Sequence, residues 1–460
     1  MKFSRKQTIA YGLGAIGKDM VYALSSGFVL YYYQDVIGLN AGFVGVILMI
    51  ARVFDAINDP MMGVVVAKTN SKWGRFRPWI LTGTVLNAFV LYALFTAPDL
   101  SKTGMMVFFS IIYILWGVTY TMMDIPFWSM IPAVTNTMQE RESLSVVGRT
   151  CAGVGNALIT IGTVALVGIL GGGNERQGFK WVALIVSILF VIFEAILFLT
   201  IKEGKDEKEM ETASIKEMFS ALFHNDQAMV TVVAIVLVNS ALYITSNLII
   251  YFFKYDLGGS DWSTSYTLFT SVGGAAQILG MMIGYPLLRK KFDNITIFKG
   301  ALCTSITGYL VLLLFCFLGL AHNLVLLFIP GVMVFAANGI LTVLTTVFLS
   351  ATVDYGEMKT GRREESVIFS MQTFVVKLAS GASVFIAGIG LEMIGLNGNS
   401  DTTGAIVQQS ASSIMGLRCM MTLLPTLGLI VALIYFSKKF ILTDKKAEEI
   451  AQQLKTKKEA

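Results

Sequence analysis

Residues 41–67 read AGFVGVILMIARVFDAINDPMMGVVVA, an apolar run long enough to cross a bilayer as one helix. Three charged side chains, Arg52, Asp55 and Asp59, interrupt this run. A charge near the centre of a membrane helix costs about 2.5–3.5 kcal/mol on insertion scales, so such residues mark functional sites or ion pairs between helices. The segment therefore predicts a membrane span that contains a polar site.

The whole chain has the composition of a multi-pass membrane protein. Of its 460 residues, 55% are hydrophobic and only 14% are charged, whereas a soluble protein has about 25% charged residues. The hydrophobic share is about 253 residues, which allows about twelve spans of ~20 residues once their Gly, Ser and Thr are included. Soluble multidomain, disordered and collagen-like proteins are excluded.

Twelve apolar segments can be placed along the chain. They run over 9–36, 41–67, 78–98, 104–133, 143–171, 178–201, 228–253, 263–288, 295–318, 323–350, 364–394 and 411–437. The polar stretch 202–227 divides them six and six. We expect an all-α integral membrane protein with two six-helix bundles, 1–201 and 228–437, and a cavity between them. Rocking-bundle transporters have this organisation.

Basic residues predict the orientation of these segments. Alternate loops, including 68–77 and 289–291, are rich in Lys and Arg, and so are both chain ends. The opposite loops have only four such residues: Lys102, Arg176, Lys180 and Lys254. Positive residues favour the cytoplasmic side. We therefore expect an inner (plasma) membrane protein whose termini, central loop 202–227 and charged tail 438–460 are cytoplasmic. The first apolar segment is expected to be an uncleaved helix.

Other functional classes have little support. The net charge is only +5 and the basic residues lie in loops, so no nucleic-acid partner is expected. The four cysteines form no CxxC pair and there are two histidines, which disfavours disulfides, zinc and haem. A membrane enzyme would need a motif such as HExxH or GxSxG, and the sequence has neither. A channel would need a continuous polar pore rather than one cluster of buried charges. We expect a monomeric transporter that has no cofactor and uses a coupling cation.

The acids in 41–67 form the first candidate site. Asp55 and Asp59 lie one turn and about 40° apart on a helix, and Asn58 lies about 60° from Asp55. Carboxylates this close repel by several kcal/mol at an effective dielectric near 20, so one must be protonated or a cation must lie between them. Two carboxylates and an amide oxygen suit a small hard cation. We expect Na+ or Li+, with H+ able to substitute.

Ion pairing between helices is the alternative for each deep charge. Four deep bases balance four deep acids: Lys18, Arg52, Arg149 and Lys377 against Asp19, Asp55, Asp59 and Asp124. A bound cation would leave this network at +1, and sharing the network with a neutral sugar would couple the two affinities reciprocally. Glu194 is one more isolated acid, and it could pair across helices or be protonated and inert.

The fourth apolar segment predicts a sugar site. Asp124 and Trp128 share a helix face, and Tyr120 lies on the neighbouring stripe. A carboxylate accepts hydrogen bonds from sugar hydroxyls, and an aromatic ring stacks on the apolar face of a pyranose. Lys18 and Arg149 would add donors. The alternative is that these aromatic side chains are core or form an interfacial belt.

Motifs spread over the whole chain point to one family. They are GLGAIGKD (12–19), ARVFDAINDPMMG (51–63), SKWGRFRPWIL (71–81), YILWGVTYTMMDIPFWS (113–129), VDYGE (353–357) and QTFVVK (372–377). Together they resemble the glycoside-pentoside-hexuronide:cation symporter family, and this resemblance implies the major-facilitator fold. The chain departs from the family pattern at two positions. Thr342 stands where the family resembled has a Trp that walls the sugar site, and Ala351 stands where it has an acid that helps to close the cytoplasmic gate.

The resemblance also implies a function and its residues. The implied sugar site consists of Lys18, Asp19, Tyr120, Asp124, Trp128, Arg149, Gln372 and Thr373. The implied Na+ site consists of Asp55, Asn58, Asp59 and Thr121, and coupling is implied for Lys377 and Arg52. The expected function is symport of a galactoside such as melibiose with Na+, Li+ or H+ by alternating access. The alternative is proton-coupled symport of another glycoside, a pentoside or a glucuronide.

Overall fold

The computed structural model describes most of the chain. The described residues are 4–134, 138–203, 223, 225–259, 261–360, 365–396 and 407–459. Within these ranges the chain is helical and contains no strand, only an isolated bridge between Ser71 and Gly74. Most of the expected central loop, 204–222 and 224, lies outside the described residues.

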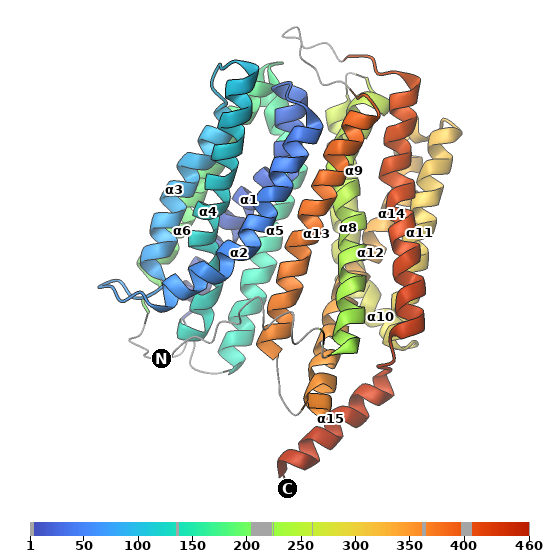
Figure 1. Cartoon of the computed structure of the whole chain (residues 1–460). Coiled ribbons are helices and arrows are strands. Elements are labelled where there is room, and N and C mark those ends of the chain that lie inside the picture. Colours follow the sequence, from blue (N-terminus) through green and yellow to red (C-terminus); the bar gives the residue numbers. More distant parts are fainter. Residues whose placement is uncertain are drawn as a thin grey trace. The chain divides into compact units, whose positions relative to one another are not determined.

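The first compact unit contains six long helices in its described part, which run side by side as blue to green ribbons in Figure 1. They are α1 (Arg5–Tyr31), α2 (Ala41–Ala67), α3 (Arg77–Thr96), α4 (Lys102–Val134), α5 (Met138–Gly171) and α6 (Glu175–Thr200). A π-helical turn, η1 (Tyr32–Val36), extends α1. At its other end Ser4 caps α1 and forms a capping box with Gln7.

The second compact unit contains the remaining helices. They are α8 (Asp226–Tyr251), η2 (Phe252–Leu257), α9 (Trp262–Leu279), η3 (Gly280–Gly284), α10 (Tyr285–Arg289), α11 (Asn294–Phe317), η4 (Leu320–His322), α12 (Leu324–Thr360), α13 (Glu365–Met393), α14 (Ala411–Lys439) and α15 (Asp444–Glu459). α9, η3 and α10 follow one another without a break and make one span. Arg418 on α14 donates two hydrogen bonds of 2.7 and 2.6 Å to the buried carboxylate of Asp256 in η2.

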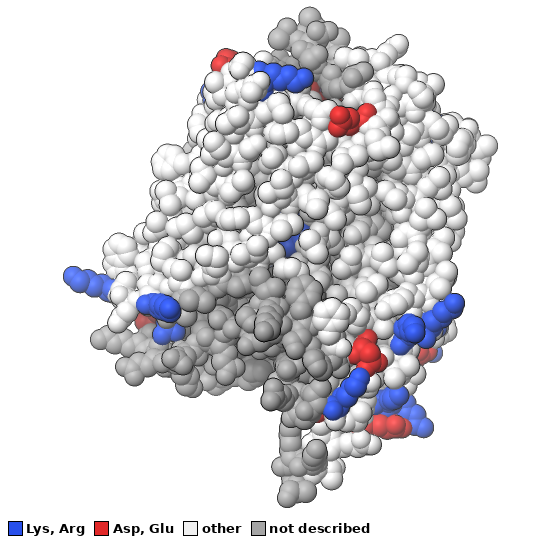
Figure 2. Space-filling view, in the orientation of Figure 1, with Lys and Arg blue, Asp and Glu red and all other residues white. Residues whose placement is uncertain are grey.

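All twelve segments expected from the sequence are helical. Over the described ranges, eleven of these helices are long and apolar enough to cross a membrane. The exception is α1, which is less apolar because Lys18, Asp19 and several glycines lie within it. In the face drawn in Figure 2, charged side chains gather mainly toward the helix ends, and the surface between them is mostly uncharged. The expected all-α membrane architecture is confirmed.

Glycines let α1 pack closely within the first unit. A Cβ on Gly14 would lie 2.7 Å from Leu197 Cδ1 on α6, and a Cβ on Gly148 of α5 would lie 2.8 Å from Tyr11 Cε1 on α1. A Cβ on Gly155 of α5 would overlap the backbone carbonyl oxygen of Ile16 on α1, where the backbone cannot move aside as a side chain can, so glycine is needed there. The resulting close contacts set the rotation of α1 about its axis, and thereby the place of Lys18.

Glu203, three residues after the end of α6, caps the beginning of α3. Glu203 accepts hydrogen bonds from the backbone N–H groups of three consecutive residues. The donors are Arg75 at 2.6 Å, Phe76 at 3.0 Å and Arg77 at 2.7 Å. The first N–H groups of a helix have no partner inside it, and the helix dipole favours a carboxylate there. Gly74 has a φ of +104°, and a Cβ on it would lie 2.6 Å from Glu203 Cδ.

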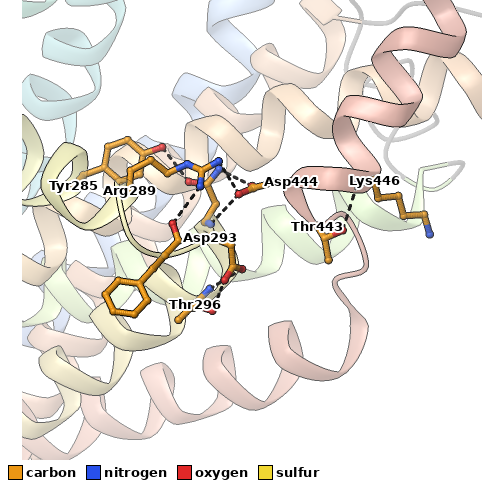
Figure 3. A network of polar contacts seen from close by, with 9 residues as sticks. Tyr285, Arg289, Asp293, Thr296, Thr443, Asp444 and Lys446 are labelled. Atoms are coloured by element: carbon orange, nitrogen blue, oxygen red, sulfur yellow. Dashed lines mark hydrogen bonds and ion pairs between the residues drawn. The ribbon is translucent and has the colours of Figure 1, made fainter.

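Polar contacts hold the tail helix α15 against α10 and α11 (Figure 3). Asp444, the first residue of α15, lies 2.7 Å from Arg289 Nη2 and accepts a hydrogen bond of 2.8 Å from Asn294 Nδ2. Tyr285 donates to Asn294 Oδ1 at 3.0 Å. Ile450 of α15 is buried in the apolar core of the second unit. This part of the tail is therefore helical and packs on its own unit.

Candidate functional site

Lys18 lies at the centre of a buried ion-pair cluster in the first unit. Its Nζ is 2.8 Å from Asp19 Oδ2 and 2.8 Å from Asp124 Oδ1. The side chain of Lys18 is 4% exposed, whereas those of Asp19 and Asp124 are 20% and 18% exposed. The lysine thus joins α1 to α4, and both carboxylates keep some surface on which another molecule could bind.

Aromatic rings lie against this cluster. Lys18 Nζ is 4.9 Å from the centre of the Trp128 ring and 6.0 Å from that of Tyr120. Arg149, an exposed residue of α5, places its Cζ 4.4 Å from the Trp128 ring. Such cation–π contacts stabilise a charge over the ring face. The cluster thus combines hydrogen-bond acceptors, cationic donors and an aromatic ring, which are the groups that bind a sugar.

Close packing between α1, α4 and α5 positions Trp128. A Cβ on Gly148 would lie 3.1 Å from Trp128 Cζ3, so the indole lies directly on the backbone of α5. Tyr11 stacks on Phe127 with 4.5 Å between ring centres and donates a hydrogen bond of 3.1 Å to the Phe127 carbonyl oxygen. These contacts link α1 to the turn of α4 that carries Trp128.

The candidate cation ligands lie where α2 packs on α4. Thr121 Oγ1 donates a hydrogen bond of 3.0 Å to Asp59 Oδ1. Arg52 Nη1 lies 3.5 Å from Asp55 Oδ2, one turn away on the same helix. A Cβ on Gly117, one turn before Thr121, would lie 2.6 Å from Asp55 Oδ1. Both acids of α2 therefore point at α4.

These ligands form an oxygen-rich set. Asn58 is half-buried on α2, between the two acids. In the part of the chain that the structure describes, no three His, Cys, Asp or Glu side chains gather where they could hold a metal ion. Two carboxylates, a hydroxyl and an amide oxygen are hard ligands, suited to a small cation without a preference for sulfur or nitrogen.

Ion pairs between the deep charges are present as well. Lys18 pairs between helices, with Asp124 on α4, and also with its neighbour Asp19. Asp55 pairs with Arg52 of its own helix. The ion-pair interpretation and the binding-site interpretation therefore concern the same residues, because the side chains that form these pairs are also the candidate ligands.

The remaining predicted residues lie on α13 in the second unit. Gln372 and Lys377 are half-buried there, and the side chain of Thr373 lies outside what the structure describes. Their parts in sugar binding and coupling stay predictions.

Tyr22 was missed by the sequence reasoning. Its ring centre lies 5.5 Å from that of Tyr120, and Arg52 Cζ lies 5.3 Å from the Tyr22 ring. Tyr22 thus contacts Tyr120 of the candidate sugar site and Arg52, which pairs with the candidate cation ligand Asp55. Its position four residues after Lys18, on the same face of α1, was the signal that could have revealed it.

The helical fold and the buried charge cluster define a membrane transporter. The family model described as "MFS/sugar transport protein" matches residues 10–443, so the chain belongs to this family of the major facilitator superfamily. The expected family is thereby confirmed at the level of sugar transport proteins.

Individual relatives agree with this assignment. The chain is 28% identical to the inner membrane symporter YicJ of Escherichia coli, over 98% of this chain and 95% of the relative. It is 28% identical to the putative glycoside/cation symporter YagG of the same organism, over 98% and 95%. It is also 28% identical to a lactose permease of Lactobacillus delbrueckii subsp. bulgaricus, over 99% and 73%.

Solved structures agree with the fold. A bacterial homologue of the human lysosomal transporter Spinster, in an inward-facing and unoccupied conformation, has a TM-score of 0.67 at 14% identity and covers 95% of this chain and 96% of its own. The nucleoside transporter NupG has a TM-score of 0.63 at 14% identity, with 95% and 100% covered. The expected major-facilitator fold is confirmed.

Proposed function

We propose that the chain is a secondary active transporter that moves a sugar together with a monovalent cation by alternating access. The observation that carries this proposal is the sharing of α4. Thr121 bonds the candidate cation ligand Asp59, and Asp124, one turn later, bonds Lys18 in the candidate sugar site. Three residues of helix correspond to a rise of about 4.5 Å, so the two ligands would bind on one rigid turn.

The sugar would bind to the Lys18 cluster. Asp19 and Asp124 would accept hydrogen bonds from its hydroxyls, and Trp128 would stack on the ring. Arg149 would donate from α5, with Tyr120 alongside and Gln372 and Thr373 contributing from α13. Hydrogen bonds to charged groups are worth about 1.5–3 kcal/mol each, so two carboxylates can supply most of the specificity for a neutral sugar.

A galactoside such as melibiose is the proposed substrate. The names of the relatives include a glycoside/cation symporter, lactose permeases and a raffinose carrier. Lactose and raffinose both contain a galactosyl unit. The second candidate is a proton-coupled carrier of another glycoside, a pentoside or a glucuronide. The exposed guanidinium of Arg149 favours the glucuronide among these, because it could pair with the carboxylate of that sugar.

The cation would bind between the two acids of α2. Asp55 and Asp59 would provide charge, Asn58 and Thr121 neutral oxygens, and the bound ion would replace the attraction of Arg52 for Asp55. Na+ is the proposed ion, with Li+ able to use the same oxygens and H+ able to protonate one acid. Lys377 and Arg52 are the proposed coupling residues.

Uptake into membrane vesicles tests both ligands. Labelled melibiose, lactose and raffinose would be offered at fixed pH, with and without a Na+ gradient. We expect Na+ to stimulate uptake of at least one of them, and preloaded sugar to drive counterflow. Uptake that ignores Na+ and follows a pH gradient would favour the proton-coupled candidate, and the absence of counterflow would argue against a carrier.

Asn58→Ala is the matched variant for the cation site. Because it removes a neutral ligand and keeps both carboxylates, it should weaken Na+ stimulation more than it weakens sugar binding. If the variant needs no more Na+ than the wild type for the same stimulation, Asn58 is not a ligand of the cation.

A further inference from the structure

Glu194 is a buried acid that neither candidate site uses. It lies on α6 and is 0% exposed. Within the described part of the chain, neither of its carboxyl oxygens has a hydrogen-bond partner. Polar groups buried in this way are rare, because each loses its bonds with water and gains none in return.

The carboxyl group of Glu194 lies against α1 at Gly14, one turn before Lys18 on that helix. A Cβ on Gly14 would lie 3.3 Å from Glu194 Oε1, 3.1 Å from Phe127 Cε2 and 2.7 Å from Leu197 Cδ1. The missing side chain of Gly14 thus makes room for the carboxyl, and the other atoms nearest to that Cβ position belong to the apolar side chains of Leu197 and Phe127.

The surrounding charges belong to the candidate sugar site. Lys18 and Asp124 are the charged groups that act on Glu194. Tyr11 of α1 and Tyr120 of α4 are also near enough for a charge on Glu194 to affect them. Beyond these, Asp19 pairs with Lys18, and Arg149 of α5 lies on the Trp128 ring.

The balance of these charges favours a neutral Glu194. The positive charges of Lys18 and Arg149 are already matched by those of Asp19 and Asp124. An ionised Glu194 would add a negative charge with no hydrogen bond to stabilise it, in a place that excludes water. A carboxyl in such surroundings is neutralised by a proton rather than left charged.

We propose that Glu194 is a proton-binding site that controls the sugar site through Lys18. With its proton bound, Glu194 leaves Lys18 to hold Asp19 and Asp124 in place for the sugar. When the proton leaves to water, the carboxylate competes with both for Lys18 and the acceptor geometry is lost. Glu194 is thus a positioning residue, and this inference rests on the proposed sugar-binding role of the Lys18 cluster.

Infrared difference spectroscopy of the purified, lipid-reconstituted protein tests the proton directly and needs no sugar. With Na+ present, so that neither Asp55 nor Asp59 needs a proton, the carbonyl band of a protonated carboxylic acid should be present at neutral pH, shift in heavy water, and disappear in Glu194→Gln. Glu392→Gln, which changes an exposed glutamate of α13, should leave the band unchanged. A band that persists in Glu194→Gln would overturn the inference. If Glu194→Gln does not insert into the membrane, Glu194→Asp should shift the frequency of the band. An unshifted band in that variant would also overturn the inference.

Binding of labelled lactose, raffinose and melibiose tests the link to the sugar site. At alkaline pH the affinity of the wild type should fall about tenfold per pH unit, as one linked proton requires, over the range in which the infrared band is lost. Glu194→Gln should remove this loss. The same pH profile in both proteins would overturn the link between Glu194 and the sugar site. A wild type that binds none of these sugars at any pH would contradict the proposed substrate, and the infrared result would then decide alone whether Glu194 binds a proton.

Discussion

Replacing Lys18 by Gln should reduce sugar affinity by about 100-fold. The two carboxylate oxygens each lie 2.8 Å from Nζ, so Asp19 and Asp124 hold oxygens no more than twice that distance apart, about 5.6 Å. Unit charges at about 5.6 Å repel by about 3 kcal/mol at an effective dielectric of 20. Without Lys18 the two acids would move apart, and a sugar that bonds both would have to bring them together again against this repulsion. Since 1.4 kcal/mol corresponds to a tenfold change, this cost lowers the affinity by about two orders of magnitude.

A double-mutant cycle isolates this interaction. Asp19→Asn should be far less costly in the Lys18→Gln protein than in the wild type, because it then removes a repulsion as well as an acceptor. We expect a coupling energy of about 3 kcal/mol from equilibrium binding of a labelled galactoside, with Lys102→Gln at the exposed start of α4 as the control. Additivity within about 0.5 kcal/mol would refute the reasoning.

Other perturbations test the cation site, the link between the sites, the orientation and the fold. Asp59→Cys should keep sugar exchange but lose uphill accumulation, and Na+-stimulated sugar affinity in this variant would place the cation elsewhere. Tyr22→Ala should weaken the effect of Na+ on sugar affinity about fivefold or more, whereas Tyr22→Phe, which keeps the ring, should resemble the wild type in the same binding assay. Lys72→Cys should react with an impermeant thiol reagent only from the cytoplasm and Lys102→Cys only from outside; the reverse pattern would contradict the predicted orientation. Glu203→Gln should lower the melting temperature of the purified protein by several degrees, because charged hydrogen bonds of about 1.5–3 kcal/mol each are weakened; unchanged melting would show that this cap is dispensable.

The helices could be predicted from the sequence because a membrane restricts the choice of structure. Every backbone group inside the bilayer must be paired within its own segment, so an apolar run of sufficient length becomes a helix. The segment expected at 263–288 shows how far this goes. The structure divides it into α9, η3 and α10, yet it remains one continuous span.

The partners of the charged residues were harder to predict. Lys18, Asp19 and Asp124 were all identified from the sequence, but their pairing depends on the rotation of α1, which glycine contacts with α5 and α6 determine. The ion pair of Asp55 with Arg52 is local and could have been read from the spacing. The cap on α3 could not, since Glu203 is more than 120 residues from the amides that it binds.

Coupling between sugar and cation needs no long pathway if both ligands bind as proposed. Thr121 and Asp124 belong to one turn of α4, so a rotation that draws Thr121 toward a cation between the acids of α2 also changes the distance from Asp124 to Lys18. The ring of Tyr22 contacts Tyr120 and Arg52 and would transmit the same movement between α1 and α2. Thermodynamic reciprocity then requires that whatever factor the cation adds to sugar affinity, the sugar adds to cation affinity.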